Sequence, residues 1–260
     1  RSVIDVSMRF ASLGSGSKGN STIVESDTAC VMVDCGFGLR NACTRLERIG
    51  KSPEDLTAII VTHEHSDHWK GIGALSAKYN IPVYLSAGSL KAKEIRSGEA
   101  LFNCIDSHKD FYVGDICIKP VPVPHDAREP IQYILSNGKV QLGILTDLGH
   151  FTPHVVSSYS KCDALLLECN YDDDMLLDGP YPRFLKDRVS GMFGHLSNRQ
   201  AADLLLALDL SRLKTLVIGH ISAKNNDVSL IKAAIEPLCG EDIVLSFADQ
   251  ESGSPWMEIK

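Results

Sequence analysis

Short apolar stretches of strand length alternate with polar turns along the first third of the chain. Residues 8–13 and 21–25 are expected to form strands joined by a loop rich in glycine and serine. Further strands are predicted near 31–33, 57–61 and 82–85. The spacing of apolar residues between them predicts helices near 38–49 and 68–79, and another after residue 85.

The second half of the chain repeats this progression from strands to helices. Residues 111–146 are β-rich, and Asn137-Gly138 between two apolar runs predicts a hairpin. Residues 164–167 are expected to form a buried strand. Residues 171–194 show no clear helical or strand periodicity and are expected to be irregular. The remaining predicted elements are a helix at 197–208, a strand at 215–218, a helix at 228–238, and strands near 243–248 and 256–259. Two β-rich regions, each followed by helices, predict two face-to-face sheets with helices outside.

The length of the chain favours one large domain. It has 260 residues, of which 44% are hydrophobic, enough for a full core. No apolar run reaches the length of a membrane span, so no membrane association is expected. The first strand pattern starts at Met8, and residues 1–7 lack the apolar core of a signal peptide. We therefore expect a single domain at 8–260, with residues 1–7 a remnant of expression.

Cysteine usage and charge narrow the functional class. The eight cysteines form no C-x-x-C pair, which does not support structural zinc on thiolates. Free thiols are favoured over disulfides, so we expect a cytoplasmic protein. The net charge of −7 argues mildly against wholesale nucleic-acid binding. Two bound divalent cations would nevertheless reverse the sign of an acidic site.

A dense cluster of histidine and carboxylate residues follows the apolar stretch that ends at Val61. His63, His65, Asp67 and His68 lie within six residues of one another. On a strand, residues i and i+2 share a face, so His63 and His65 can approach one metal ion. Asp67 and His68 follow where the chain turns into a helix and can reach a second ion. The alternative is a solvated turn, but zinc, manganese and iron all accept this ligand chemistry.

Three further candidate ligands follow predicted strands downstream. His125 comes after Val121–Pro124, Asp147 after Leu142–Leu145, and His220 after Thr215–Ile218. A single histidine in such a position is more often a core residue, and a single aspartate is often only a turn residue. Their succession behind His-x-His-x-Asp-His favours a site at the sheet edge.

This succession resembles the metallo-β-lactamase superfamily over most of the chain. The resemblance implies an α/β fold, an αββα sandwich of two mixed β-sheets flanked by helices. It also implies two divalent metal ions, Zn²⁺ or Mn²⁺. One would be held by His63, His65 and His125, and the other by Asp67, His68 and His220, with Asp147 bridging them. Asp34, in Val33-Asp34-Cys35-Gly36, resembles the aspartate that orients a ligand histidine, although a strand-end turn is the alternative.

A finer resemblance concerns three short segments. Residues 8–21 are similar to the opening of the YycJ/WalJ family, as are Thr146–Gly149 and Gly194–Asn198. That family is regarded as containing metal-dependent exonucleases that digest double-stranded DNA from the 5′ end. The resemblance therefore implies a DNA substrate.

The glycine-rich segment 14–19 formally matches G-x-G-x-x-G, but a strand pattern follows it instead of a helix. A phosphate-binding Walker loop would need lysine at position 20, where Asn20 stands. No nucleotide cofactor is expected. Two interpretations remain open: a tight turn, or a loop whose amides, with Ser17, Lys18 and Asn20, hold a phosphate near the metals.

A capping box, Ser197-x-x-Gln200, predicts a helix start directly after His195. Free amides at a helix start suit a phosphate, so His195 is a candidate to bind a phosphoryl oxygen or protonate the leaving oxygen. A solvent-facing histidine is the alternative. Glu168 follows a buried strand and either orients His195 or a ligand, or lies on the surface. Basic residues nearby either track a DNA backbone or form a solvated face: Arg183, Lys186, Arg188, Arg199 and Lys224.

Three functions remain from these observations. The first is a two-metal phosphodiesterase, a 5′ to 3′ exonuclease on double-stranded DNA, in which a metal-activated hydroxide attacks phosphorus. Asp67 would position that hydroxide and His195 would steady the transition state. The second is a small-molecule hydrolase acting on a cyclic phosphate, lactone or thioester, which the acidic charge suits. The third is a non-catalytic metal-binding carrier or partner protein, against which the complete ligand set argues. Neither the metal nor the oligomeric state follows from the sequence.

Overall fold

The computed structural model describes residues 8–95 and 101–260, and the predicted remnant at 1–7 lies outside them. Its first sheet has seven strands in the order β14-β1-β2-β3-β4-β5-β6. The pairs formed by β14, β1, β2 and β3 are antiparallel, and those from β3 to β6 are parallel. The strands are β1 (Met8–Gly14), β2 (Ser21–Glu25), β3 (Cys30–Val33), β4 (Ala58–Ile60), β5 (Val83–Ser86), β6 (Phe102–Ile105) and β14 (Met257–Ile259).

The second sheet also has seven strands, in the order β13-β12-β11-β10-β9-β8-β7. Its antiparallel half runs from β7 to β10, and its parallel half from β10 to β13. The predicted Asn137-Gly138 hairpin is confirmed between β9 and β10, with Gly138 at φ 84°. The strands are β7 (Phe111–Val113), β8 (Ile116–Pro122), β9 (Ile131–Ser136), β10 (Gln141–Leu145), β11 (Ala164–Glu168), β12 (Thr215–Gly219) and β13 (Val244–Phe247).

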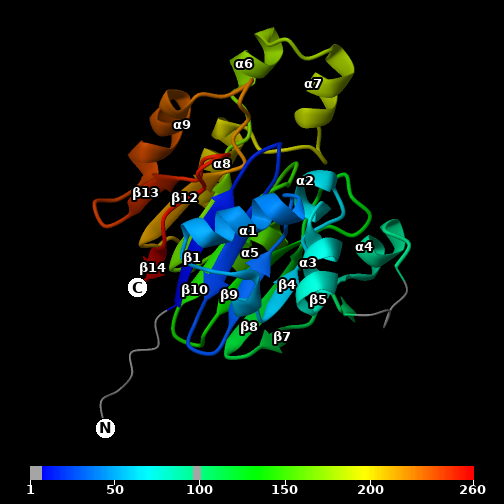
Figure 1. The fold of residues 1–260 in the computed structure, drawn as a ribbon. Helices are drawn as coiled ribbons and strands as arrows, with labels where there is room; N and C mark the ends of the chain where they lie inside the picture. The colour runs from blue at the N-terminus through cyan, green and yellow to red at the C-terminus, as the bar shows by residue number, and fades with distance from the viewer. Residues whose placement is uncertain (1–7, 96–100) are drawn as a thin grey trace.

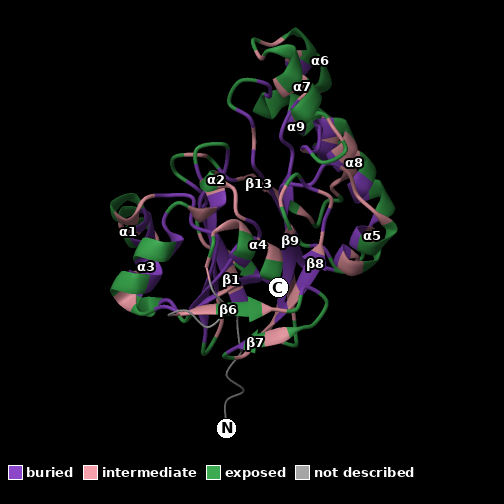
Figure 2. Ribbon diagram, turned by 90° about the vertical axis from the view of Figure 1, so that its right-hand side faces the viewer, coloured by how far each residue is buried: buried purple, intermediate pink, exposed green. Residues whose placement is uncertain are grey.

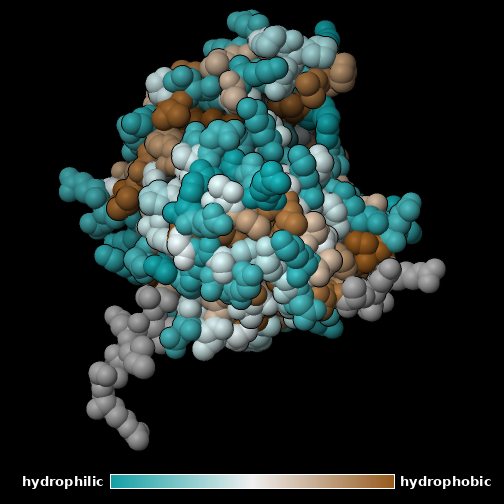
Figure 3. All heavy atoms as spheres, viewed as in Figure 1, coloured by the Kyte–Doolittle hydropathy of each residue, from teal (hydrophilic) through white to brown (hydrophobic). Residues whose placement is uncertain are grey.

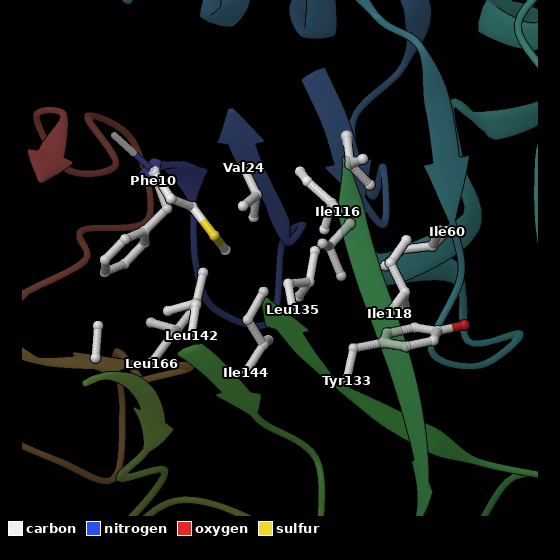
Figure 4. Close-up of a cluster of buried hydrophobic side chains, with 14 of the residues drawn as sticks. Phe10, Val24, Ile60, Ile116, Ile118, Tyr133, Leu135, Leu142, Ile144 and Leu166 are labelled. Atoms are coloured by element: carbon white, nitrogen blue, oxygen red, sulfur yellow. The ribbon is translucent and has the colours of Figure 1, made fainter. Parts of the chain in front are cut away.

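The main core lies between the inner faces of the two sheets (Figure 4). Phe10 and Val24 from the first sheet meet Leu135, Leu142 and Leu166 from the second. The side chains point inward because alternate residues of a strand face the same way. A buried hydroxyl also links the layers, since Tyr133 Oη of β9 donates a hydrogen bond of 2.7 Å to the carbonyl of Val61.

Helices cover the outer face of each sheet (Figures 1 and 2). Those on the first sheet are α1 (Leu39–Arg48), α2 (Ser66–Trp69), α3 (Ile72–Tyr79) and α4 (Ala87–Ala92), with the 3-10 turn Pro53–Asp55. Those on the second are α5 (Pro153–Tyr159), α8 (Asn198–Ala207) and α9 (Val228–Ile235), with the 3-10 turn Glu236–Leu238. Two more, α6 (Asp173–Asp178) and α7 (Arg183–Val189), project above the layered body. No helix of the described ranges is long and apolar enough to cross a membrane.

The sandwich of two mixed sheets flanked by helices is confirmed. The single predicted helix at 68–79 is wrong, because α2 and α3 are separate. Between them the amide of Gly71 donates to the carbonyl of Cys35 instead of continuing α2, and a side chain at Gly71 would collide with the carbonyl of Phe37. The prediction that 171–194 is irregular is also wrong. Asp172 caps α6 by accepting a hydrogen bond from the amide of Met175, and α7 follows. The single-domain extent 8–260 stays a prediction.

We expect Tyr133→Phe to lower the free energy of unfolding by about 1–3 kcal/mol, because it leaves the buried Val61 carbonyl without its Tyr133 hydrogen bond. Denaturant unfolding measures the loss. Tyr112→Phe is the control. Tyr112 is 69% exposed, so this change should have little effect on the free energy of unfolding. Equal effects at both positions would contradict the structural role assigned to Tyr133.

Candidate metal centre and active site

The predicted ligands meet at one edge of the sandwich because each follows a strand that ends there. His63 and His65 lie on the loop after β4, and α2 carries Asp67 and His68. His125, Asp147 and His220 follow β8, β10 and β12. Asp147 and His220 have left-handed backbones, with φ of 54° and 52°. Such conformations are uncommon outside glycine and indicate that the surrounding structure fixes these residues.

The seven predicted ligands fall into overlapping groups, and within each group the ligand atoms lie within 4.8 Å of one another. One group contains His63, His65 and His125, as the sequence predicted for the first metal. Another contains Asp67, His68 and His220, as predicted for the second. Asp147 lies between them, since it joins His63 and His68 in a third group and also belongs to a fourth with Glu168, His195 and His220.

Two buried nitrogens support metal binding at these residues. Thr62 Oγ lies 2.9 Å from His63 Nδ1, so Nε2 is the remaining ring nitrogen. That nitrogen is buried and has no hydrogen-bond partner in the described part of the chain, and the same holds for His220 Nε2. A buried polar atom without a partner is costly, whereas an imidazole lone pair directed at a cation is stable. The donor set therefore fits divalent metal ions.

Asp34 lies where the sequence placed the residue that orients a ligand. Its Oδ2 accepts a hydrogen bond of 2.8 Å from His68 Nδ1 and another of 2.6 Å from the Thr62 hydroxyl. Its Oδ1 accepts one of 2.8 Å from the Thr62 amide. With the proton of His68 held on Nδ1, Nε2 faces Asp147 Oδ2 at 3.1 Å. Asp34 thereby sets the tautomer of a candidate ligand.

Glu168 is fully buried, so its interpretation as a surface carboxylate is wrong. Its Oε1 accepts hydrogen bonds of 2.7 Å from His195 Nδ1 and 2.8 Å from His220 Nδ1. Its Oε2 accepts two more from the amides of Leu148 and Leu196. His195 itself lies just before the predicted capping box, which the structure contains at Ser197. One carboxylate therefore orients both histidines.

The protonation of the cluster follows from burial and the carboxylates. Burial lowers the pKa of His63 well below its usual range and keeps the ring neutral. Burial opposes the charge on His220 as well, but Asp147, Asp67 and Glu168 outweigh it and raise the pKa of His220 to about 10. A metal ion on Nε2 would therefore have to displace a proton there. Burial would raise the pKa of Asp147, yet His220 and His68 hold it well below its usual value. Asp147 is therefore ionised, as a metal ligand must be.

An open cavity of about 340 Å³ lies over these residues, and Leu185, Arg188 and Val189 of α7 line it as well. Its lining residues from the ligand cluster include His65, Asp67, Asp147 and His220, and His195 joins them. Figure 3 shows mostly polar surface with scattered hydrophobic residues in the upper region, where Figure 1 places α6 and α7. Leu177 of α6 and Phe184 of α7 are 70% and 73% exposed.

The glycine-rich loop has features of both a tight turn and a loop that faces the site. Ser17 lines the cavity, whereas the ammonium of Lys18 is 4.0 Å from Glu251 and its amide donates to Gln250. The side chain of Asn20 closes the loop, since its Oδ1 accepts from the Gly16 amide at 2.8 Å. Asn20 Nδ2 also lies 3.1 Å from His68 Nε2. The loop is thus a tight turn that brings one hydroxyl and one amide to the site.

Asp126 and Thr62 were missed as site residues. Asp126 lines the cavity, and its Oδ1 lies 3.4 Å from His125 Nε2. Its position next to His125 was the only signal in the sequence. Thr62 contacts both Asp34 and His63, and its position immediately before His63 could have suggested this.

Comparison with known proteins agrees with the geometry. A family model described as a beta-lactamase superfamily domain matches residues 30–221, most of the chain. The chain belongs to the metallo-β-lactamase superfamily. Among solved structures of the superfamily, the metallo-beta-lactamase fold protein YhfI from Bacillus subtilis has a TM-score of 0.74 at 15% identity. The match covers 97% of this chain and 99% of that one.

Two bacterial relatives are closer in sequence, and the expected resemblance to the YycJ/WalJ family is confirmed. The exodeoxyribonuclease WalJ of Streptococcus pneumoniae is 33% identical, over 85% of this chain and 84% of that protein. The exodeoxyribonuclease YycJ of Bacillus anthracis is 31% identical, over 90% of each chain. The chain is a metallo-β-lactamase-fold hydrolase by this kinship.

We expect Asp34→Asn to weaken metal binding by about 10–100-fold with little change in the fold. Asparagine tolerates the positive φ of 58° but would direct an amide donor at His68 Nδ1, which moves the proton to Nε2. Titration against a chelating dye measures the affinity. Asp27→Asn, in an exposed turn, is the control, and equal affinity in both variants would contradict the role of Asp34.

Proposed function

We propose that this protein is a metal-dependent exonuclease that degrades double-stranded DNA from the 5′ end. The observation that carries the proposal is a pair of adjoining ligand groups beneath an open cavity, His63 with His65 and His125, and Asp67 with His68 and His220. Asp147 lies near both groups, 3.1 Å from His68 Nε2 and 4.0 Å from His125 Nε2. Two metals a few ångströms apart are the arrangement used in many phosphodiester hydrolases. The names of the relatives supply the DNA substrate and the exonuclease activity.

In this proposal the seven ligands hold two divalent ions, Zn²⁺ or Mn²⁺. Such ions, when bound, lower the pKa of water and neutralise charge on phosphoryl oxygens. Asp67 is partly exposed to the cavity, with 24% of its side chain accessible, so it can hold the attacking water as well as a metal. Its carboxylate would orient that water in line with the scissile bond.

His195 is the proposed partner of the leaving oxygen. Its Nδ1 donates to Glu168, so its Nε2 is the nitrogen available to substrate, and 21% of the side chain is exposed at the cavity. Glu168 holds the ring through Nδ1, which leaves Nε2 to donate a proton to the leaving oxygen. His195 would bind substrate directly, whereas Glu168 acts through it as a positioning residue.

The alternative is a small-molecule hydrolase on the same fold, acting on a cyclic phosphate, lactone or thioester. The observation that favours it is the cavity, whose volume of about 340 Å³ would enclose a small ester. The cavity is open, however, and longer substrates can extend from it. A cytoplasmic location, expected from free thiols, stays part of the proposal.

Linear duplex DNA labelled at its 5′ or its 3′ ends tests the activity and polarity together. We expect early release of the 5′ label with Mn²⁺ or Zn²⁺ and none with chelator. His65→Ala and Asp67→Ala should abolish release, because each removes a proposed ligand, while circular dichroism shows an intact fold. Release that persists in both variants, or that starts at the 3′ label, would refute the proposal as stated. No release with any metal would favour the small-molecule alternative.

We expect His195→Gln to lower kcat roughly 10²- to 10⁴-fold, as loss of a general acid does. Glu168→Gln should have a smaller effect on kcat, because the histidine remains but its orientation weakens. A substrate with a leaving group that needs no protonation, such as a nitrophenyl phosphodiester, should restore much of the rate of the His195 variant. If that substrate is slowed as much as DNA, His195 is not the proton donor.

A further inference from the structure

The cavity presents an electrostatic problem for a phosphodiester substrate. Three carboxylates line it, those of Asp67, Asp126 and Asp147, and two of them belong to the candidate metal ligands. Among its lining residues, all in the described ranges, Arg188 is the one side chain with a permanent positive charge. A substrate with negative charges on either side of the scissile bond needs a positive charge in addition to the metal ions, to bind the second phosphate. Arg188 is placed to supply that charge.

Arg188 is held in a fixed orientation and still exposed. Its Nε donates a hydrogen bond of 2.6 Å to Asp126 Oδ2, while 59% of the side chain is accessible. The hydrogen bond to Asp126 raises the pKa of Arg188 above its already high value. In the described part of the chain, no group forms a hydrogen bond with the two Nη atoms of Arg188. A guanidinium bound to a carboxylate through Nε therefore keeps its Nη edge for the oxygens of a phosphate.

The backbone around Arg188 is fixed to the active site. The carbonyl of Val189, its neighbour on α7, accepts a hydrogen bond of 2.8 Å from the amide of His195. The carbonyl of Phe193 accepts one of 3.0 Å from the Asp126 amide, and that of Gly194 accepts one of 3.0 Å from His125 Nδ1. The end of α7 therefore has a defined position relative to a candidate metal ligand and to the proposed acid.

The other basic residues of this region are engaged elsewhere, and none lines the cavity. Arg183 pairs with Asp187 at 3.7 Å, and Lys186 donates to the carbonyl of Leu177. Arg199 pairs with two aspartates at the start of α6 and on α8, and Lys224 lies over the ring of Tyr181. Among the five basic residues of the sequence analysis, geometry thus separates Arg188 from the rest.

We propose that Arg188 binds the phosphate adjacent to the scissile phosphodiester. This rests on the proposed function, and it identifies the substrate as a chain with at least two consecutive phosphates. Asp126 holds the guanidinium so that little side-chain entropy is lost when the phosphate binds. A substrate with a single phosphodiester has no group for Arg188 to bind.

The test compares Arg188→Gln and Arg188→Lys with Arg183→Gln, which removes the same charge from the same helix outside the cavity. Label release from 5′-labelled duplex DNA is measured at several salt concentrations, and bis(4-nitrophenyl) phosphate serves as a substrate with one phosphodiester. We expect Arg188→Gln to raise KM for DNA roughly ten- to hundredfold, the loss of a charged hydrogen bond, with kcat little changed. KM for DNA should also depend less steeply on salt concentration, by the equivalent of about one phosphate contact.

Arg188→Lys should retain the salt dependence but raise KM, because an ammonium cannot form the bidentate contact. Arg183→Gln should match the wild type, and all variants should hydrolyse the single phosphodiester equally. Equal KM values in Arg188→Gln and wild type would overturn the assignment while leaving the exonuclease intact. The assignment would also be overturned if Arg183→Gln raised KM for DNA as much as Arg188→Gln does. Slower hydrolysis of bis(4-nitrophenyl) phosphate by the Arg188 variants would overturn it as well. A wild type that releases no label refutes the exonuclease itself.

Discussion

The geometry of the site depends on one buried carboxylate, that of Asp34. It follows β3 in a left-handed conformation and accepts hydrogen bonds from the amide and hydroxyl of Thr62 and from His68 Nδ1. A buried carboxylate is costly unless such partners surround it, so the ends of β3 and β4 and the start of α2 must meet at a fixed distance. The same bonds determine the His68 tautomer. The contacts that join these elements of the first sheet therefore also orient a candidate ligand.

The second sheet uses a corresponding device at Glu168, at the end of β11. This carboxylate accepts hydrogen bonds from His195 and His220, one before α8 and the other after β12. Asp34 and Glu168 thus organise histidines from opposite sheets, and Asp147 lies between the two sets. Because the ligands come from both layers, their distances depend on how the sheets pack. A disturbance of the core between the sheets should therefore reach the site even without contact with it.

The parts of the site that follow local rules were predictable. Alternation on an apolar strand brings His63 and His65 together, and Asn137-Gly138 specifies a hairpin whatever surrounds it. The parts that depend on tertiary contacts were not. Gly71 separates α2 from α3 through contacts with a distant loop, since its amide donates to the carbonyl of Cys35 and the carbonyl of Phe37 packs against it. The α7 helix has no buried residue that would have produced an apolar period, so the pairing of Arg188 with Asp126 had no signal in the sequence.

The acidic character of the chain is compatible with the proposed DNA substrate. Charges separated by more than roughly 10 Å are largely screened at physiological salt, so the net charge of −7 acts weakly at the cavity. What acts there is local: Asp126 is bound to Arg188, and Asp67 lies near the ring nitrogens of His68 and His220. An enzyme of this kind would hold DNA by a few phosphates near the reacting end.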